Sequence, residues 1–445
     1  MSAVDASVVE RLETYSGTPP PFGHAMHKYF GFDPKYVNLN HGSYGSLPLP
    51  VAAYCEKIGR QIEASPDRFM RVELASYMRP LRARIAKLVG AERDEIVLVP
   101  NASHGVSTVL WNIEWHEQDI LVGTSTTYNA VERNIRYLGD IPPHPRVREF
   151  QLNWPLTHSA IVDAFRAHIQ ALKATQNYDG SGPKPKIVAV IDGIVSNPGV
   201  AYPWKELTKI CHEEGVWSVV DAAHCIGQEV DINLSEVKPD FWVSNCHKWL
   251  YAKRGCAVLY VPKRNQHIIK SAFPTPHAYV SPTDPQGGPE APNFIEQFGW
   301  TGTRDYAPYL SVDEALNFRE WLGGERKINE YCHSLALEGG KRLAEVMGTR
   351  VLDETGELTL NMTNVELPLS ANVPNDGAVN VYFQKKLLVE WNTYAAHFFH
   401  NGKWYLRASA QIWNEISDFD YLGKAFKSVC AELEASYANG PGLKN

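Results

Sequence analysis

The feature that most constrains the fold is an alternation between short apolar segments and longer stretches with helical periodicity. The apolar segments are rich in β-branched residues and have the length of buried strands, at 95–99, 119–123, 186–191, 217–220, 240–243 and 256–261. Helix-period stretches at 128–138, 157–172 and 204–214 lie between several of them. Apolar strands that alternate with helices predict an α/β fold with a mainly parallel sheet, covered by helices on both faces.

The alternation also divides the chain into two blocks. Residues 56–315 are expected to form a large α/β domain, which ends in a Pro- and Gly-rich stretch, 273–289, typical of loops. After it, the pattern predicts a long helix over 312–346, strands at 357–362 and 403–409, and a last helix from about Asp418. We expect residues 316–445 to form a smaller α+β domain, together with residues 1–55.

Composition excludes several classes of function. The 445 residues include 43 basic and 50 acidic side chains, a net charge of −7 that gives no general reason to bind nucleic acid or an anionic membrane. No long apolar run predicts a membrane-spanning helix, and the N-terminus lacks the pattern of a secretion signal. The seven cysteines are scattered singly, which predicts reduced thiols in the cytoplasm and neither a disulfide framework nor a metal site.

Two strand ends carry the residues that indicate chemistry. They are the motif VDAAH (220–224) and the motif SNCHKW (244–249). Because ligands of an open parallel sheet bind beyond the carboxyl ends of its strands, one crevice is expected to receive Asp221, His224, Ser244, Asn245, His247 and Lys248. A lysine that can form a Schiff base and a carboxylate that can pair with a pyridine nitrogen are what a pyridoxal phosphate site requires.

A phosphate group needs clustered N–H donors, which a helix N-terminus supplies. The segment PNASHG (100–105) lies between a predicted strand and a helical run, where such a terminus is expected. Each of these residues could also have an ordinary structural role. Asp221 or Ser103 could cap a helix, and Lys248 could be a surface charge. The occurrence of three strand-end motifs within one α/β pattern favours the cofactor site.

These motifs resemble those of the fold-type I, class V aminotransferase family of pyridoxal phosphate enzymes, in its isopenicillin-N-epimerase-like branch. The matching segments span most of the chain: NLNHGSYG (38–45), NASHG (101–105), STTY (125–128), VDAAH (220–224), SNCHKW (244–249), GTRD (302–305) and LRAS (406–409). The resemblance implies that Lys248 holds the cofactor and moves the Cα proton, that Asp221 pairs with the pyridine nitrogen, and that Tyr128 stacks on the ring.

The resemblance also implies the remaining roles. Phosphate binding falls to Ser103, His104, Ser244 and His247, while Ser196 and His224 lie near the ring. Thr303 reaches the phosphate of the neighbouring subunit, so an obligatory homodimer is expected. Arg407 binds the α-carboxylate of an amino-acid substrate through two parallel hydrogen bonds, and His41 and Tyr44 complete the substrate site.

The motifs leave the reaction open, because the cofactor stabilises a Cα carbanion that can have several fates. Two fungal enzymes resemble the chain: LolT, which builds a ring in loline alkaloid biosynthesis, and hercynylcysteine sulfoxide lyase. In the lyase a cysteine follows the stacking tyrosine, and Phe150 occupies that stretch here. We therefore predict a LolT-like enzyme that forms a carbon–carbon bond or a heterocycle. The alternatives are a C–S lyase, an amino-acid epimerase and a cofactor-binding protein without turnover.

Overall fold

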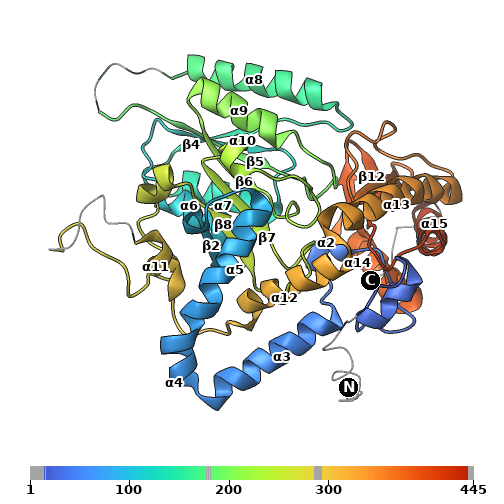
Figure 1. The fold of residues 1–445 in the computed structure, drawn as a ribbon. Coiled ribbons are helices and arrows are strands. Elements are labelled where there is room, and N and C mark those ends of the chain that lie inside the picture. Colours follow the sequence, from blue (N-terminus) through green and yellow to red (C-terminus); the bar gives the residue numbers. More distant parts are fainter. Residues whose placement is uncertain are drawn as a thin grey trace.

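The computed structural model describes residues 15, 17–176, 178, 180, 182–284 and 293–438, so residues 285–289, the end of the Pro- and Gly-rich stretch, lie outside it. A seven-stranded sheet forms the centre of the molecule (Figure 1). In spatial order its strands are β2 (Ile96–Val99), β8 (Ala257–Tyr260), β7 (Phe241–Asn245), β6 (Trp217–Asp221), β5 (Ile187–Asp192), β3 (Ile120–Thr124) and β4 (Arg146–Phe150). Only β8 runs antiparallel to its neighbours, so the mainly parallel sheet is confirmed.

Successive strand residues point into two separate cores. In β5, Ile187, Ala189 and Ile191 face one core, whereas Val188 and Val190 face the other. The first core is covered by α3 (Leu49–Ala64), α5 (Leu74–Val89), α8 (His158–Ala174), α9 (Trp204–Glu214) and α12 (Ala307–Leu322). The second is covered by α6 (Ala102–Asn112), α7 (Asn129–Asp140) and α11 (Phe294–Gly299). Because both faces are covered, the central strands are apolar along most of their length, and most of their polar residues lie at the carboxyl ends.

A smaller antiparallel sheet carries the C-terminal part of the chain. Its strands, in spatial order, are β11 (Ala396–His400), β12 (Lys403–Ser409) and β9 (Met362–Glu366). A third core packs it against α13 (Gly324–Met347), α14 (Gly377–Lys385) and α15 (Ile416–Ala438), beside η5 (Lys386–Glu390). In Figure 1 the labels α13, α15 and β12 mark this part, which lies to one side of the large sheet.

The N-terminal segment joins the two parts. Its short strand β1 (Val37–Asn38) pairs in parallel with β10 (Thr393–Tyr394).

The other short elements are η1 (His24–Tyr29), α2 (His41–Tyr44), α4 (Pro66–Arg68), η2 (Phe69–Glu73), η3 (Arg93–Glu95), α10 (Leu234–Val237) and η4 (Lys263–Ile268). In the part of the chain that the structure describes, no helix combines the length and the apolar character needed to span a membrane.

Three secondary-structure predictions differ from the structure. The helix predicted over 312–346 is two helices, because Gly323 lies between them with a left-handed φ of 110° that ends α12. Residues 357–361, predicted as strand, form a loop whose Leu358 N–H and Thr359 hydroxyl donate to Asp353. Strand β4 was not predicted, since its charged side chains interrupt the apolar pattern.

The two predicted domain boundaries fall inside continuous helices. The boundary between residues 55 and 56 lies within α3, and the boundary between 315 and 316 lies within α12. These two helices contact each other and belong to the core of the large sheet. The large and small parts are therefore connected through shared helices, and the division into domains stays a prediction.

Two helical glycines differ in the space around them, so substitution of each by alanine tests packing at one and backbone flexibility at the other. At Gly339 in α13 an added Cβ would lie 2.4 Å from the Phe419 ring of α15, whereas at Gly59 in α3 it would meet nothing within 4 Å. We expect Gly339→Ala to lower the free energy of unfolding by about 1–3 kcal/mol through overpacking. Gly59→Ala should raise it by about 0.5–1 kcal/mol, since alanine restricts the unfolded chain. Urea unfolding of both variants tests this; equal effects would contradict the packing argument.

Candidate active site

The carboxyl ends of three neighbouring strands meet beside a cavity. Asp192 ends β5, Asp221 ends β6 and Asn245 ends β7, and these strands pair in parallel. The cavity has a volume of about 290 Å³, and its lining includes Ser43, Tyr44, Asn101, Ser103, Tyr128, Asp192, Ser196, Asp221, His224, Asn245, His247 and Lys248. The crevice expected at the strand ends is thus present, and it contains both an amine and carboxyl groups.

Lys248 places a partly buried amine in this cavity. Its Nζ lies 3.0 Å from Nε2 of His224. Burial and the nearby positive charge of Arg407 lower the pKa of Lys248 to about 7, against the opposite effect of Asp221. A substantial fraction of the amine is therefore neutral near pH 7, and only the neutral amine can act as a nucleophile or a base.

Two carboxyl groups, those of Asp192 and Asp221, lie side by side at the site. Asp192 and Asp221 are partners in the register of β5 and β6, and both are buried. Burial raises the pKa of each carboxyl group, and the charge of Asp221 raises that of Asp192 further, well above its usual range. Lys248 lowers the pKa of Asp221 in turn. Asp221, next to the amine of Lys248, is therefore the better placed of the two to carry the negative charge that a pyridinium nitrogen would require.

The first turn of α6 forms an anion cradle at one end of the cavity. Asn101 caps the helix by accepting from the backbone N–H of His104 at 2.8 Å, and Asn245 accepts from the N–H of Ala102 at 2.9 Å. Between them Ser103 lines the cavity. His247 also lines it and donates Nδ1–H to the carbonyl of Cys256 at 3.1 Å, so Nε2 of the neutral ring carries a lone pair and can donate to an anion only after it takes up a proton. The N-terminus of α6 with the Ser103 side chain beside it fits a phosphate group, and a protonated His247 would add a further donor.

Arg407 is a buried cation whose hydrogen-bond partners are all neutral. Its guanidinium donates to the carbonyl of Ser196 at 2.7 Å, to the hydroxyl of Ser43 at 3.0 Å and to Asn40 at 3.4 Å, while its Nε has no partner in the described structure. Burial lowers the pKa of Arg407 to about 10. Ser43 and Ser196 both line the cavity. A buried guanidinium without a carboxylate partner is suited to bind an anionic ligand.

The structure brings most of the predicted site residues together. Arg407 lies beside the cavity, and the residues that line it are Tyr44, Ser103, Tyr128, Ser196, Asp221, His224, His247 and Lys248. Tyr44 and Tyr128, which are 70% and 47% exposed, form the mouth of the cavity. These residues converge on one small-molecule site, and their individual roles remain proposals.

Four predicted residues lie elsewhere. The Ser244 hydroxyl donates to the carbonyl of Ala222 and accepts from the N–H of Ile226 at 3.0 Å, so it bridges two backbone segments below the site. The side chain of His104 does not line the cavity. His41 is buried against the rings of Trp249, Tyr251 and Trp413, and burial lowers its pKa to about 3. Thr303 is exposed and lies outside this cavity.

Two site residues were not predicted, although the sequence held a signal for one of them. Asp192 directly follows the apolar strand 186–191, as Asp221 follows its own strand, so the same rule would have found it. Ser43 had no such signal, because its position depends on the contact with Arg407, which is 364 residues away in sequence.

Phe150 does not face the cavity. Its ring packs against Phe165 and His168, with ring centroids 5.6 and 5.3 Å away. The residue therefore belongs to the core, and it gives no evidence about which group stands over a bound substrate. All seven cysteines fall within the described residues, and each is buried and absent from the cavity lining. Within the described ranges, no group of His, Cys, Asp or Glu side chains could hold a metal ion.

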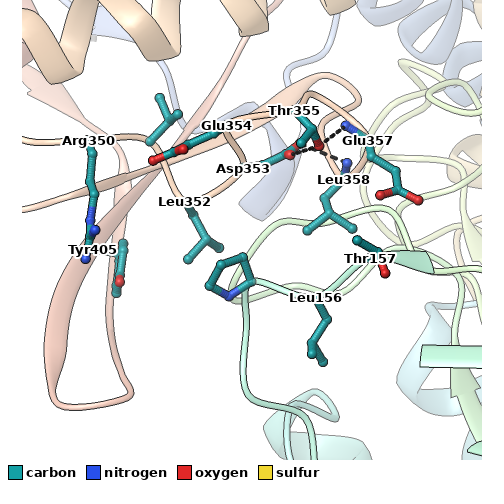
Figure 2. Close-up of a pocket in the computed structure, with 12 residues that line it drawn as sticks. Leu156, Thr157, Arg350, Leu352, Asp353, Glu354, Thr355, Glu357, Leu358 and Tyr405 are labelled. Atoms are coloured by element: carbon teal, nitrogen blue, oxygen red, sulfur yellow. Dashed lines mark hydrogen bonds between the residues drawn. The ribbon is translucent and has the colours of Figure 1, made fainter. Parts of the chain in front are cut away.

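A second hollow, of about 480 Å³, lies between the loop ahead of α8 and residues 350–358 (Figure 2). Its acidic side chains are Asp353, Glu354 and Glu357. Asp353 accepts hydrogen bonds from Thr355, from the N–H groups of Gly356 and Leu358, and from Thr359. The carboxylate is thus occupied in holding its own loop. The hollow contains neither Lys248 nor Arg407, and we assign no reaction to it.

The fold and the site define a class of protein: an α/β enzyme with a partly buried lysine and a buried carboxylate at the edge of a parallel sheet. Comparison with known proteins supports this class. The family model "Aminotransferase class-V" matches residues 63–374. The chain belongs to the aminotransferase class-V family, whose enzymes depend on pyridoxal 5′-phosphate. The amine, the two carboxyl groups and the anion cradle described above fit that cofactor.

Individual relatives extend over nearly the whole chain. The L-cysteine desulfhydrase-like protein lolT1 of Epichloe uncinata is 35% identical, over 93% of this chain and 97% of its own. Hercynylcysteine sulfoxide lyase of Schizosaccharomyces pombe is 30% identical, over 92% and 98%. Among solved structures, the cysteine desulfurase of Thermococcus onnurineus NA1 superposes with a TM-score of 0.74 at 15% identity, over 94% of this chain and 100% of its own, which supports the fold alone.

The lowered pKa of Lys248 predicts how cofactor attachment depends on pH. Below about pH 7 the amine is protonated and attachment should be slow; above it the neutral amine should react at a constant rate. Absorbance after addition of pyridoxal phosphate to the cofactor-stripped chain measures this midpoint. Lys248→Ala should give no lysine-bound band, and Lys209→Ala, at an exposed lysine, should leave the midpoint unchanged. A midpoint near that of an ordinary lysine would contradict the assignment.

Proposed function

We propose that this protein is a lyase that cleaves the Cβ–S bond of a cysteine-type amino acid. The observation that carries the proposal is the location of Arg407, a buried cation with only neutral partners, beside the cavity that contains Lys248 and Asp221. In this arrangement Arg407 can bind the α-carboxylate of an amino acid while Lys248 removes the Cα proton of the same molecule. The names of the relatives, an L-cysteine desulfhydrase-like protein and a hercynylcysteine sulfoxide lyase, support sulfur as the leaving atom.

Each residue of the site has its own role in the proposed reaction. Pyridoxal phosphate, when bound, stabilises negative charge at Cα of the amino acid. Lys248, neutral in part at pH 7, removes the Cα proton, and Arg407 orients the amino acid by its carboxylate. Asp221 supplies the charge that keeps a pyridine nitrogen protonated. The leaving sulfur group departs through the mouth formed by Tyr44 and Tyr128.

A LolT-like ring-forming reaction is the second candidate. It is favoured by the absence of a cysteine from the cavity lining, since no thiol is present to protonate a departing sulfur group. The argument from Phe150 no longer separates it from the lyase, because that ring lies in the core. The identity to lolT1 is compatible with both candidates, and we place the lyase first on the relatives' names.

A homodimer and a cytoplasmic location also belong to this proposal. Thr303 is exposed and lies outside the cavity of its own subunit, which is compatible with contact to the cofactor phosphate of a partner subunit. The seven cysteines are free thiols, as expected for a reducing compartment.

Product identification tests the reaction. L-Cysteine should yield pyruvate, ammonia and sulfide, and an S-alkyl-L-cysteine sulfoxide should yield pyruvate together with a sulfur product. O-Acetyl-L-homoserine with an aldehyde should yield no heterocyclic amino acid. Mass spectrometry and a pyruvate assay measure these products, and Lys248→Ala serves as the control without turnover. A heterocyclic product without pyruvate would favour the second candidate and overturn the first.

Replacement of Arg407 tests carboxylate binding. Arg407→Lys keeps a positive charge but loses the paired donors, so KM for the amino acid should rise about tenfold to hundredfold, since a charged hydrogen bond contributes about 1.5–3 kcal/mol. The affinity for pyridoxal phosphate should not change. Arg350→Lys, at an exposed arginine paired with Glu366, is the matched control. An equal loss of pyridoxal phosphate affinity in Arg407→Lys would contradict a substrate-specific role.

A further inference from the structure

A chain of three hydrogen-bonded side chains ends at the cofactor lysine. The indole Nε1–H of Trp249 donates to Nδ1 of His224 at 3.1 Å, and Nε2 of His224 lies 3.0 Å from Nζ of Lys248. Trp249 and His224 are both buried. Trp249 does not line the cavity, so any effect that it has on the chemistry passes through His224.

The donor and acceptor roles in this chain follow from chemistry. An indole nitrogen can only donate, so Nδ1 of His224 must accept and carries no proton. Burial lowers the pKa of His224 well below its usual range, and the ammonium form of Lys248 would lower it further, so the ring is neutral in either state of the lysine. A neutral imidazole without a proton on Nδ1 has it on Nε2. His224 therefore donates toward the cavity, and Lys248 accepts through the lone pair of its neutral amine.

The position of the indole is itself fixed. Arg319 donates to the carbonyl of Trp249 at 2.8 Å and to the carbonyl of Gly227 at 2.9 Å, and it pairs with Glu325 at 2.5 Å. At Gly227 an added Cβ would lie 2.6 Å from the carbonyl carbon of Trp249, so the two segments are in close contact. The indole is thus held by its backbone, and its N–H keeps a constant direction.

We propose that Trp249 is a positioning residue that holds His224 in the tautomer with hydrogen on Nε2, so that the site presents a donor to Lys248 and to the cofactor. Without the indole N–H, His224 can place its proton on Nδ1 and offer the Nε2 lone pair to the cavity. That lone pair would accept a hydrogen bond from the ammonium form of Lys248. The protonated lysine would be stabilised, and less neutral amine would be present at a given pH.

Other charges act on the same pair and do not depend on Trp249. The charged and titratable groups that face it are Asp221 from β6, Arg407 from β12, His247 from the segment after β7 and His41 from α2. None of them donates to Nδ1 of His224, so replacement of the indole N–H leaves their contributions unchanged.

The test is the pH midpoint of cofactor attachment in the full-length chain. In that reaction the lysine nitrogen attacks the aldehyde carbon of pyridoxal phosphate and water leaves, so its rate follows the neutral amine. For Trp249→Phe we expect the midpoint to rise by about one pH unit, which lowers the rate at pH 7 about fivefold. Site-specific replacement of Trp249 by benzothienylalanine keeps the shape of the indole and removes the N–H. It should give the same shift.

A double-mutant cycle separates this role from packing. In a His224→Phe background, where no ring nitrogen is present, Trp249→Phe should move the midpoint no further. An unchanged midpoint with benzothienylalanine, or an equal shift in the His224→Phe background, would overturn the proposal. The inference rests on Lys248 as the cofactor lysine, which Lys248→Ala tests separately. The inference does not depend on which substrate is converted. Failure of the proposed lyase reaction would appear in the products, whereas failure of this inference would appear in the pH midpoint.

Discussion

The site depends on burial of one amine between charges of opposite sign. Removal from water lowers the pKa of Lys248, the nearby guanidinium of Arg407 lowers it further, and Asp221 acts against both. The parallel sheet makes this arrangement possible, because it brings the carboxyl ends of β5, β6 and β7 to one edge while helices exclude water from both faces. Burial raises the pKa of the second carboxyl group, Asp192, well above its usual range, and the charge of Asp221 raises it further, so the two acids are not expected to be ionised together.

Much of this could be predicted from the sequence, since the relevant patterns are local. Apolar runs between helical stretches located the central strands, and the polar residues after two of those runs located Asp221 and Lys248. The position of a strand end in a parallel sheet is a strong constraint, because all such ends share one edge. Arg407 was located by its motif in β12, and the structure places it beside the same cavity.

The residues that could not be predicted depend on side-chain direction or on distant contacts. Ser244 and Lys248 are only four positions apart, yet the Ser244 hydroxyl bonds to backbone behind the sheet edge. Phe150 and His41 also turn into packed aromatic surroundings, which a motif does not reveal. Gly323 interrupts a helical pattern whose apolar spacing continues on both sides of it, so periodicity alone gave one helix.

The contacts of Arg319 limit how the smaller part of the molecule can move. Its guanidinium lies in α12, while its partner Glu325 lies at the start of α13, and together they enclose the bend at Gly323. A swing of α13 about that bend would take Glu325 away from the buried guanidinium of Arg319 and leave that charge without its carboxylate partner. The corner between the two helices therefore acts as a rigid joint, and any closure of the small sheet over a substrate must pivot elsewhere.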